Sequence, residues 1–161
     1  MASGLDEWKI WLEQHGRALA LFARQWVSTR ADAEDVVQEA FIRFWRSRQR
    51  VADPTAYLYA CVKHCALDAQ RSHRRRLKRE QATARPETEP LFGGIEQSER
   101  RRMMQASLRN LPENQREAVV MRIWGGLSFV QIGAALGTSP DTAASRYRYA
   151  MARLRAELSG E

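Results

Sequence analysis

Residues 126–148 decide the fold of this chain and read Gly-Leu-Ser-Phe-Val-Gln-Ile-Gly-Ala-Ala-Leu-Gly-Thr-Ser-Pro-Asp-Thr-Ala-Ala-Ser-Arg-Tyr-Arg. Apolar residues recur at helical spacing from Phe129 to Leu136 and predict a short packed helix. Gly137 comes next, where a left-handed residue commonly ends a helix. Ser139 and Pro140 then match the cap and the first position of a second helix. The stretch therefore predicts a helix-turn-helix.

The predicted second helix has one apolar face and one polar face. In a helix-turn-helix, the first residues of the second helix meet base edges in the major groove of DNA. Arginine, serine and threonine side chains suit contacts to bases and phosphates. An ordinary helical hairpin with a solvated basic face is the alternative. The polar face consists of Thr142, Ser145, Arg146, Tyr149 and Arg153.

The overall composition points to a polyanionic partner. The chain has 161 residues, a net charge of +7 and a pI near 10.1. This charge suits nucleic acid or an anionic membrane surface and does not decide between them. No segment reaches the apolar length of a membrane span, and acidic residues near the N-terminus do not fit a secretory signal. We therefore expect a cytoplasmic protein that does not insert into a membrane.

The periodicity of the chain predicts an all-α protein, because no alternating β-branched run is present. We expect two small helical domains, residues 1–79 and 97–161, joined by a flexible linker at 80–96 that contains prolines and paired glycines. The first domain begins with one helix ending near Gly16 and another running to about Ser28. The second domain has four helices, of which the last two form the helix-turn-helix.

A third helix, which we expect Asp32 to cap, has an acidic first half in a basic protein. Asp35, Gln38 and Glu39 lie beside its apolar stripe. These residues could simply compensate the helix dipole and add solubility. They could instead form a docking edge for a basic partner protein.

A fourth helix is predicted to open at Asp53 and Pro54 and to run towards Arg79. One of its sides becomes steadily more basic and includes His64, Arg71, Arg74 and Arg75. This alignment favours contact with a phosphate backbone over a merely solvated run of charges.

The sequence offers little for catalysis or metal binding. Cys61, His64 and Cys65 are zinc-type ligands within about one helical turn, but a fourth ligand is missing, so we expect no metal site. The two cysteines are expected to remain thiols. No phosphate loop and no grouping of a nucleophile with a base appears. We therefore expect a protein that is not an enzyme and has no cofactor.

Over nearly its full length, the chain resembles the extracytoplasmic-function group of bacterial sigma-70-type sigma factors. Residues 32–45 resemble region 2.2 of that family. The sequence Ala56-Tyr-Leu-Tyr, followed by Asp68 and Arg71, resembles regions 2.3 and 2.4, and residues 111–155 resemble region 4. The resemblance implies a subunit that recruits core RNA polymerase and helps to open promoters.

The resemblance also implies partners for each surface. Asp35, Gln38 and Glu39 would dock on the β′ coiled coil of polymerase. The helix-turn-helix residues would bind the −35 element, and region 4 would also contact the β flap. The resemblance leaves open whether an anti-sigma factor binds this chain. The implied −10 contacts are Tyr57, Tyr59, Lys63, His64, Arg71, Arg74 and Arg75.

Five positions depart from the family's frequent residues, so the family's usual promoter sequence cannot be assigned to this chain. Tyr57 stands where tryptophan is frequent, the pair 63–64 is Lys-His rather than Arg-Asn, Gln131 replaces glutamate, and Tyr149 replaces arginine. Two other functions remain. A stand-alone helix-turn-helix regulator would require palindromic half-sites. A DNA-processing enzyme would need a catalytic cluster that we do not find.

Overall fold

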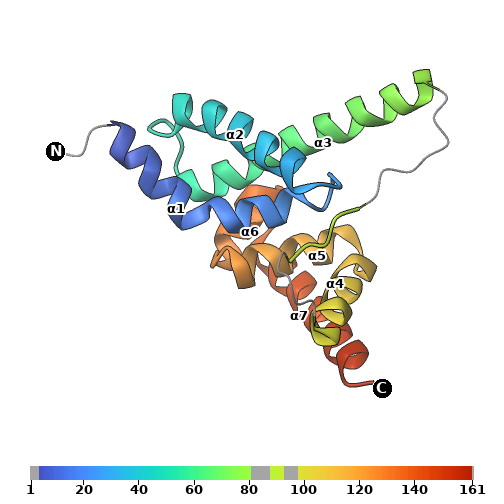
Figure 1. Cartoon of the computed structure of the whole chain (residues 1–161). Coiled ribbons are helices and arrows are strands. Elements are labelled where there is room, and N and C mark those ends of the chain that lie inside the picture. The colour runs from blue at the N-terminus through green and yellow to red at the C-terminus, as the bar shows by residue number, and fades with distance from the viewer. Residues whose placement is uncertain (1–3, 81–87, 93–97, 161) are drawn as a thin grey trace.

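The computed structural model describes residues 4–80, 88–92 and 98–160, and every regular element in these ranges is a helix. The predicted all-α fold is confirmed. Figure 1 shows the N-terminal helices above the C-terminal ones, with the end of α3 projecting away from the body. The elements in chain order are α1 (Gly4–Ala23), α2 (Arg30–Ser47), α3 (Pro54–Glu80), α4 (Glu99–Asn110), α5 (Glu113–Val119), the π-helical η1 (Val120–Trp124), α6 (Phe129–Leu136) and α7 (Pro140–Leu158).

The first two predicted helices are one continuous helix, so the break expected near Gly16 is wrong. Its apolar stripe runs without interruption from Trp8 and Trp11 to Leu19 and Phe22 and packs on the core. A glycine inside a helix costs only about 1 kcal/mol. The apolar stripe packs on the core on both sides of Gly16, partly buried before it and fully buried after it, and this packing outweighs that cost.

Side-chain caps mark where α2 and α3 begin. Thr29 caps α2, because its hydroxyl accepts a hydrogen bond from the amide of Asp32 at 3.1 Å. The predicted cap at Asp32 is therefore wrong by three residues, and Asp32 lies in the first turn. Asp53 does cap α3 as predicted, since its carboxylate accepts from the amide of Ala56 at 3.1 Å.

The helix-turn-helix forms at the predicted residues. Gly137 is left-handed, with φ of 72°, and Ser139 accepts a hydrogen bond from the amide of Thr142. Gly133 lets the chain turn tightly, because a Cβ there would lie 2.6 Å from the carbonyl oxygen of Thr138. Gln131 completes a capping box with Ser128.

The two halves of the chain share one hydrophobic core. α3 packs on α6, and α1 packs on η1. Phe22, Phe41 and Leu58 from the first half are continuous with Met121 and Ile132 from the second half. A smaller cluster lies within the second half, around Leu108, Leu111, Val119, Ala150 and Leu154. The two halves of the chain therefore pack against each other in this fold.

Part of the expected linker is held against the body. Glu89 donates its amide to the carbonyl of Ser28 at 3.0 Å, and its carboxylate accepts from the amide of Arg30 at 3.0 Å. The guanidinium of Arg109 donates to the Glu89 carbonyl at 3.1 Å. Residues 88–92 therefore tie the turn before α2 to α4. The remaining residues predicted as flexible linker, apart from Glu80, lie outside the described ranges.

Candidate nucleic-acid and polymerase interfaces

The acidic edge of α2 faces outward. Buried side chains on the opposite side of α2, including Val37 and Phe41, fix its orientation. Asp35, Gln38 and Glu39 are all exposed. The Glu39 carboxylate is 3.0 Å from the guanidinium of Arg43, one turn further along. Surface pairs of this kind contribute little to stability, so this contact leaves Glu39 accessible to a partner.

The edge continues into an exposed apolar residue that our sequence-based docking set omits. Ile42 lies three residues after Glu39 and is 46% exposed. An apolar side chain in line with a polar docking edge is a typical anchor in protein interfaces. The sequence could have indicated this anchor, because Ile42 is an apolar residue that lies outside the buried stripe of α2.

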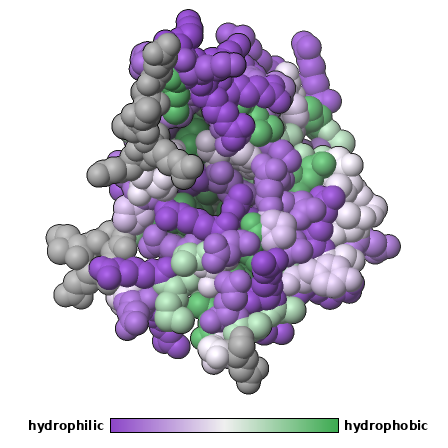
Figure 2. Space-filling model, turned by 90° about the vertical axis from the view of Figure 1, so that its right-hand side faces the viewer, coloured by the Kyte–Doolittle hydropathy of each residue, from purple (hydrophilic) through white to green (hydrophobic). Residues whose placement is uncertain are grey.

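The outer half of α3 presents basic side chains to solvent. His64, Arg71, Arg74 and Arg75 are exposed. Asp68 lies among them, 3.8 Å from Nε2 of His64 and 3.8 Å from Nη1 of Arg71. Asp68 and the three arginines line a shallow hollow. The face turned to the viewer in Figure 2 is mostly hydrophilic, with small apolar areas between the polar residues.

The first half of α3 differs from the prediction. Tyr59 is fully buried and packs edge-on against Phe22, with ring centroids 5.3 Å apart. Placing Tyr59 among the DNA-contacting residues is wrong for this arrangement, because its ring is part of the core. Tyr57 is half-buried against Phe44. Lys63 points to the second half of the chain, where its Nζ lies 3.0 Å from a carboxylate oxygen of Glu117.

The polar face of α7 lies on the surface as the helix-turn-helix requires. Thr142 and Arg153 are exposed, Ser145 and Arg146 are half-exposed, and Tyr149 is 68% exposed. Arg148, which our set omits, donates to the Ser145 hydroxyl at 3.2 Å. Arg153 lies 3.7 Å from Glu157. The first turns of α7 thus offer hydroxyl, guanidinium and phenol groups along one side.

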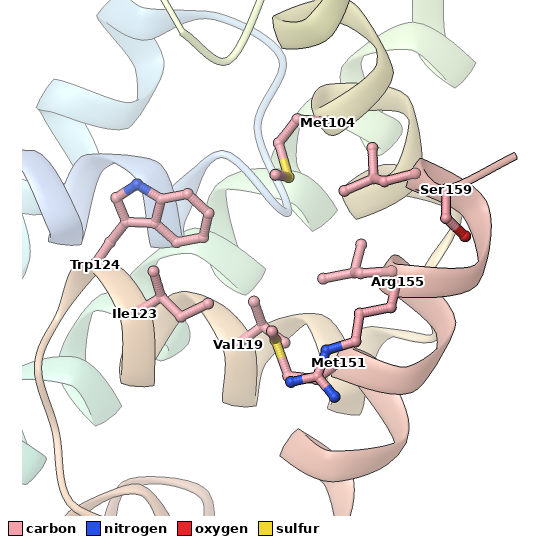
Figure 3. A pocket seen from close by; sticks show the side chains of 9 residues that line it. Met104, Val119, Ile123, Trp124, Met151, Arg155 and Ser159 are labelled. Atoms are coloured by element: carbon pink, nitrogen blue, oxygen red, sulfur yellow. The ribbon is translucent and has the colours of Figure 1, made fainter.

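An apolar groove between α4, η1 and α7 was not predicted from the sequence. Its volume is about 480 Å³. Figure 3 shows Met104 on one side, Ile123 and Trp124 on another, and Met151 and Arg155 on α7. Methionines adapt to different apolar surfaces, which suits a docking groove. The lining residues are Met104, Val119, Ile123, Trp124, Met151, Leu154, Arg155, Leu158 and Ser159.

The cysteines pack as small core residues. Cys61 and Cys65 are free and buried in α3. Burial raises the pKa of both thiols, that of Cys65 to about 11. Within the described residues, no group of three or more His, Cys, Asp and Glu side chains is placed to hold a metal ion. No helix in the described ranges is long and apolar enough to cross a membrane.

Two sequence families match the two halves of the chain. Residues 11–76 match Sigma-70 region 2, and residues 101–154 match Sigma-70, region 4. The first match contains α2 and most of α3, and the second contains most of the groove lining and the helix-turn-helix. The chain belongs to the sigma-70 family of RNA polymerase sigma factors.

Individual relatives place the chain in the extracytoplasmic-function (ECF) group of this family. It is 34% identical to the ECF RNA polymerase sigma factor SigJ of Mycobacterium tuberculosis, covering 93% of this chain but only 51% of the relative. It is 31% identical to the RNA polymerase sigma-E factor of Streptomyces coelicolor, covering 94% of this chain and 86% of the relative. This chain is thus a transcription initiation factor that directs polymerase to promoters.

Solved structures share the fold. The sigma factor RpoE of Bartonella quintana, in complex with the anti-sigma factor NepR, has a TM-score of 0.74 at 23% identity, covering 95% of this chain and 97% of that one. CnrH, in complex with the cytosolic domain of CnrY, has a TM-score of 0.66 at 24% identity, covering 99% and 92%.

Proposed function

We propose that this sigma factor uses four separate surfaces, two for polymerase and two for promoter DNA. The observation that carries the proposal is the segregation of charge: an acidic edge on α2, within a chain of net charge +7, and basic or hydroxyl-bearing faces on α3 and α7. Acidic and basic surfaces on different helices can bind a protein and a nucleic acid at the same time.

The edge formed by Asp35, Gln38 and Glu39 docks on the β′ coiled coil of polymerase, and Ile42 adds an apolar anchor. The exposure of all four side chains supports this role. Complementary charge speeds association and sets orientation, whereas the apolar contact supplies much of the affinity.

The outer half of α3 holds the −10 element. Arg71, Arg74 and Arg75 bind backbone phosphates, and His64 lies within the same surface. Tyr57 has the aromatic ring that could stack on an unpaired base. Lys63 joins this surface only when its contact with Glu117 is broken, and Tyr59 supports it from the core.

The first turns of α7 read the −35 element. Thr142, Ser145, Arg146 and Tyr149 contact base edges or phosphates, and Arg153 contacts the backbone. A tyrosine ring at position 149 can pack against a thymine methyl group. The groove around Trp124 and Met151 receives the β flap, since its lining is almost wholly apolar.

The protein acts without catalytic chemistry or a cofactor, as a specificity subunit. Its place of action is the cytoplasm, where its polymerase and promoter partners are. We also propose an anti-sigma partner, because one similar solved structure is the sigma factor RpoE in complex with the anti-sigma factor NepR, and another is CnrH in complex with the cytosolic domain of CnrY.

Run-off transcription tests the proposal. The purified protein is mixed with core RNA polymerase and a library of upstream fragments from its own genome. We expect promoter-dependent transcripts that require both components. Binding to a palindromic site without polymerase, together with an absence of transcripts, would instead favour a stand-alone regulator.

A further inference from the structure

One end of the expected linker is built into the second half of the chain. Leu91 and Phe92, at the end of the 88–92 segment, are half-buried. The amide of Leu91 donates to Oε1 of Gln105 in α4 at 3.2 Å. The side chain of Phe92 packs against the smaller apolar cluster of the second half. Both contacts are made with the second half, so the end of the segment packs as part of that half.

Gln105 gives the segment a specific place to dock. Its side chain is 5% exposed and lies on the buried side of α4 with Leu108. A buried amide destabilises a fold unless it is hydrogen-bonded. The Leu91 amide supplies a donor for the side-chain carbonyl oxygen of Gln105. A glutamine at this buried position can thus hold the 88–92 segment, whereas an apolar residue of similar size would suit only the cluster.

Phe92 in turn contacts a tryptophan at the edge of the apolar groove. The ring centroids of Phe92 and Trp124 lie 5.8 Å apart, with 31° between the ring planes, which is within the range of favourable aromatic pairs. Trp124 is 36% exposed and lines the groove, but Phe92 is not among the lining residues. Figure 3 shows Trp124 at one edge of the groove, with Ile123 beside it. Phe92 therefore supports the tryptophan ring from outside the groove and leaves the groove open.

A fixed orientation of Trp124 favours binding of a partner in the groove. Tryptophan is among the residues that contribute most to protein interfaces. A side chain that is ordered before binding loses less conformational entropy in the complex. Because the Trp124 ring is partly exposed, a neighbouring ring on one side limits the orientations that it can take.

We propose that Phe92 is a positioning residue for the polymerase-binding groove, and that Gln105 holds it in place through the backbone of Leu91. This role rests on the proposed function, in which the groove receives the β flap. The end of the linker is then more than a tether, because the side chain at position 92 sets the affinity of the groove for polymerase.

The test compares wild type with Phe92→Ala, Phe92→Tyr and the control Val130→Ala in the intact chain. Val130 is 64% exposed on α6 and lies outside the groove lining, so its truncation removes apolar surface elsewhere. Affinity for core RNA polymerase is measured by pull-down titration. We expect Phe92→Ala to bind about 3- to 10-fold more weakly than wild type, and Phe92→Tyr, which keeps the ring, to bind like wild type and the control. Wild-type affinity in a folded Phe92→Ala protein would overturn the positioning role.

DNA binding provides a second readout for the same variants. Affinity for a fluorescent mixed-sequence DNA duplex is followed by anisotropy and should be unchanged in Phe92→Ala, because Phe92 lies outside the proposed DNA-binding faces of α3 and α7. Equal losses of polymerase and DNA binding would indicate general damage to the second half and would also overturn the role.

Gln105→Met separates positioning from folding. Methionine keeps a side chain of similar size in the cluster and removes the acceptor for the Leu91 amide. Nε2 of Gln105 has no hydrogen-bond partner within the described ranges, so loss of the buried amide offsets loss of its one bond. We expect weaker polymerase binding without a loss in Tm. If Phe92→Ala loses helical circular dichroism, Gln105→Met decides, and wild-type affinity in that folded variant would refute the role.

Polymerase without the tip of its β flap distinguishes this role from the proposed function. If removal of the tip leaves the affinity of wild type unchanged, the groove does not receive the flap, and the role of Phe92 fails with it. If removal of the tip weakens wild type but Phe92→Ala binds intact polymerase like wild type, only the role of Phe92 fails.

Discussion

Replacement of Tyr59 by phenylalanine should stabilise the protein. The Tyr59 ring is fully buried, and its hydroxyl has no hydrogen-bond partner within the described ranges. Its burial also raises the pKa of the phenol, which is consistent with a dry site. The Tyr59→Phe change keeps the ring contact with Phe22 and removes only the unpaired oxygen.

The expected gain follows from the cost of an unpaired buried polar group, which is about 1–3 kcal/mol. Removal of the oxygen leaves a small void, so we expect a net gain of about 1 kcal/mol. For a chain of this length, that corresponds to a rise in Tm of roughly 2–4 °C. Thermal unfolding followed by circular dichroism at neutral pH measures it.

Tyr57→Phe is the matched control. The Tyr57 hydroxyl hydrogen-bonds with the Cys61 thiol and is half-buried, so its removal loses a contact. We expect a loss of about 0.5–1 kcal/mol for this variant. If Tyr59→Phe lowers Tm as much as Tyr57→Phe does, the Tyr59 hydroxyl has a partner and the reasoning is refuted.

Three other outcomes are expected. Glu39→Lys should weaken binding to core polymerase by at least roughly tenfold, because the charge reversal opposes a basic partner; unchanged affinity in a pull-down titration would move the docking site elsewhere. Arg146→Ala should cost about 1–3 kcal/mol in binding to a promoter duplex if it makes a bidentate base contact, and an equal loss on scrambled DNA in the same anisotropy assay would make it a phosphate contact. Burial raises the pKa of Glu117 against the lowering by Lys63, with Glu113 raising it and Arg146 lowering it. The stability that protonated Glu117 gives is therefore present below the ordinary glutamate pKa and is lost as pH rises through the raised pKa, so in urea unfolding wild type should lose stability relative to Glu117→Gln as pH rises above the ordinary glutamate pKa.

The sequence by itself determined the local structure at several helix ends, where a residue acts on the backbone next to it. Gly137, Ser139 and Asp53 end or begin helices through a left-handed turn or a side-chain cap, and each does so at the predicted position. The helical character and the helix-turn-helix followed from the same local rules, because periodicity fixes which face of a helix is apolar.

The tertiary structure decided which of those faces are available. Gly16 did not break α1, because packing of its apolar stripe on the core on both sides of Gly16 outweighs the propensity of one residue. Tyr57 and Tyr59 are both tyrosines near the start of the same helix, yet packing against Phe22 and the core shared by the two halves buries Tyr59 fully. Likewise, the pairing of Lys63 with Glu117 joins residues 54 positions apart. Burial and long-range ion pairs depend on how the halves meet, and helical periodicity carries no information about that.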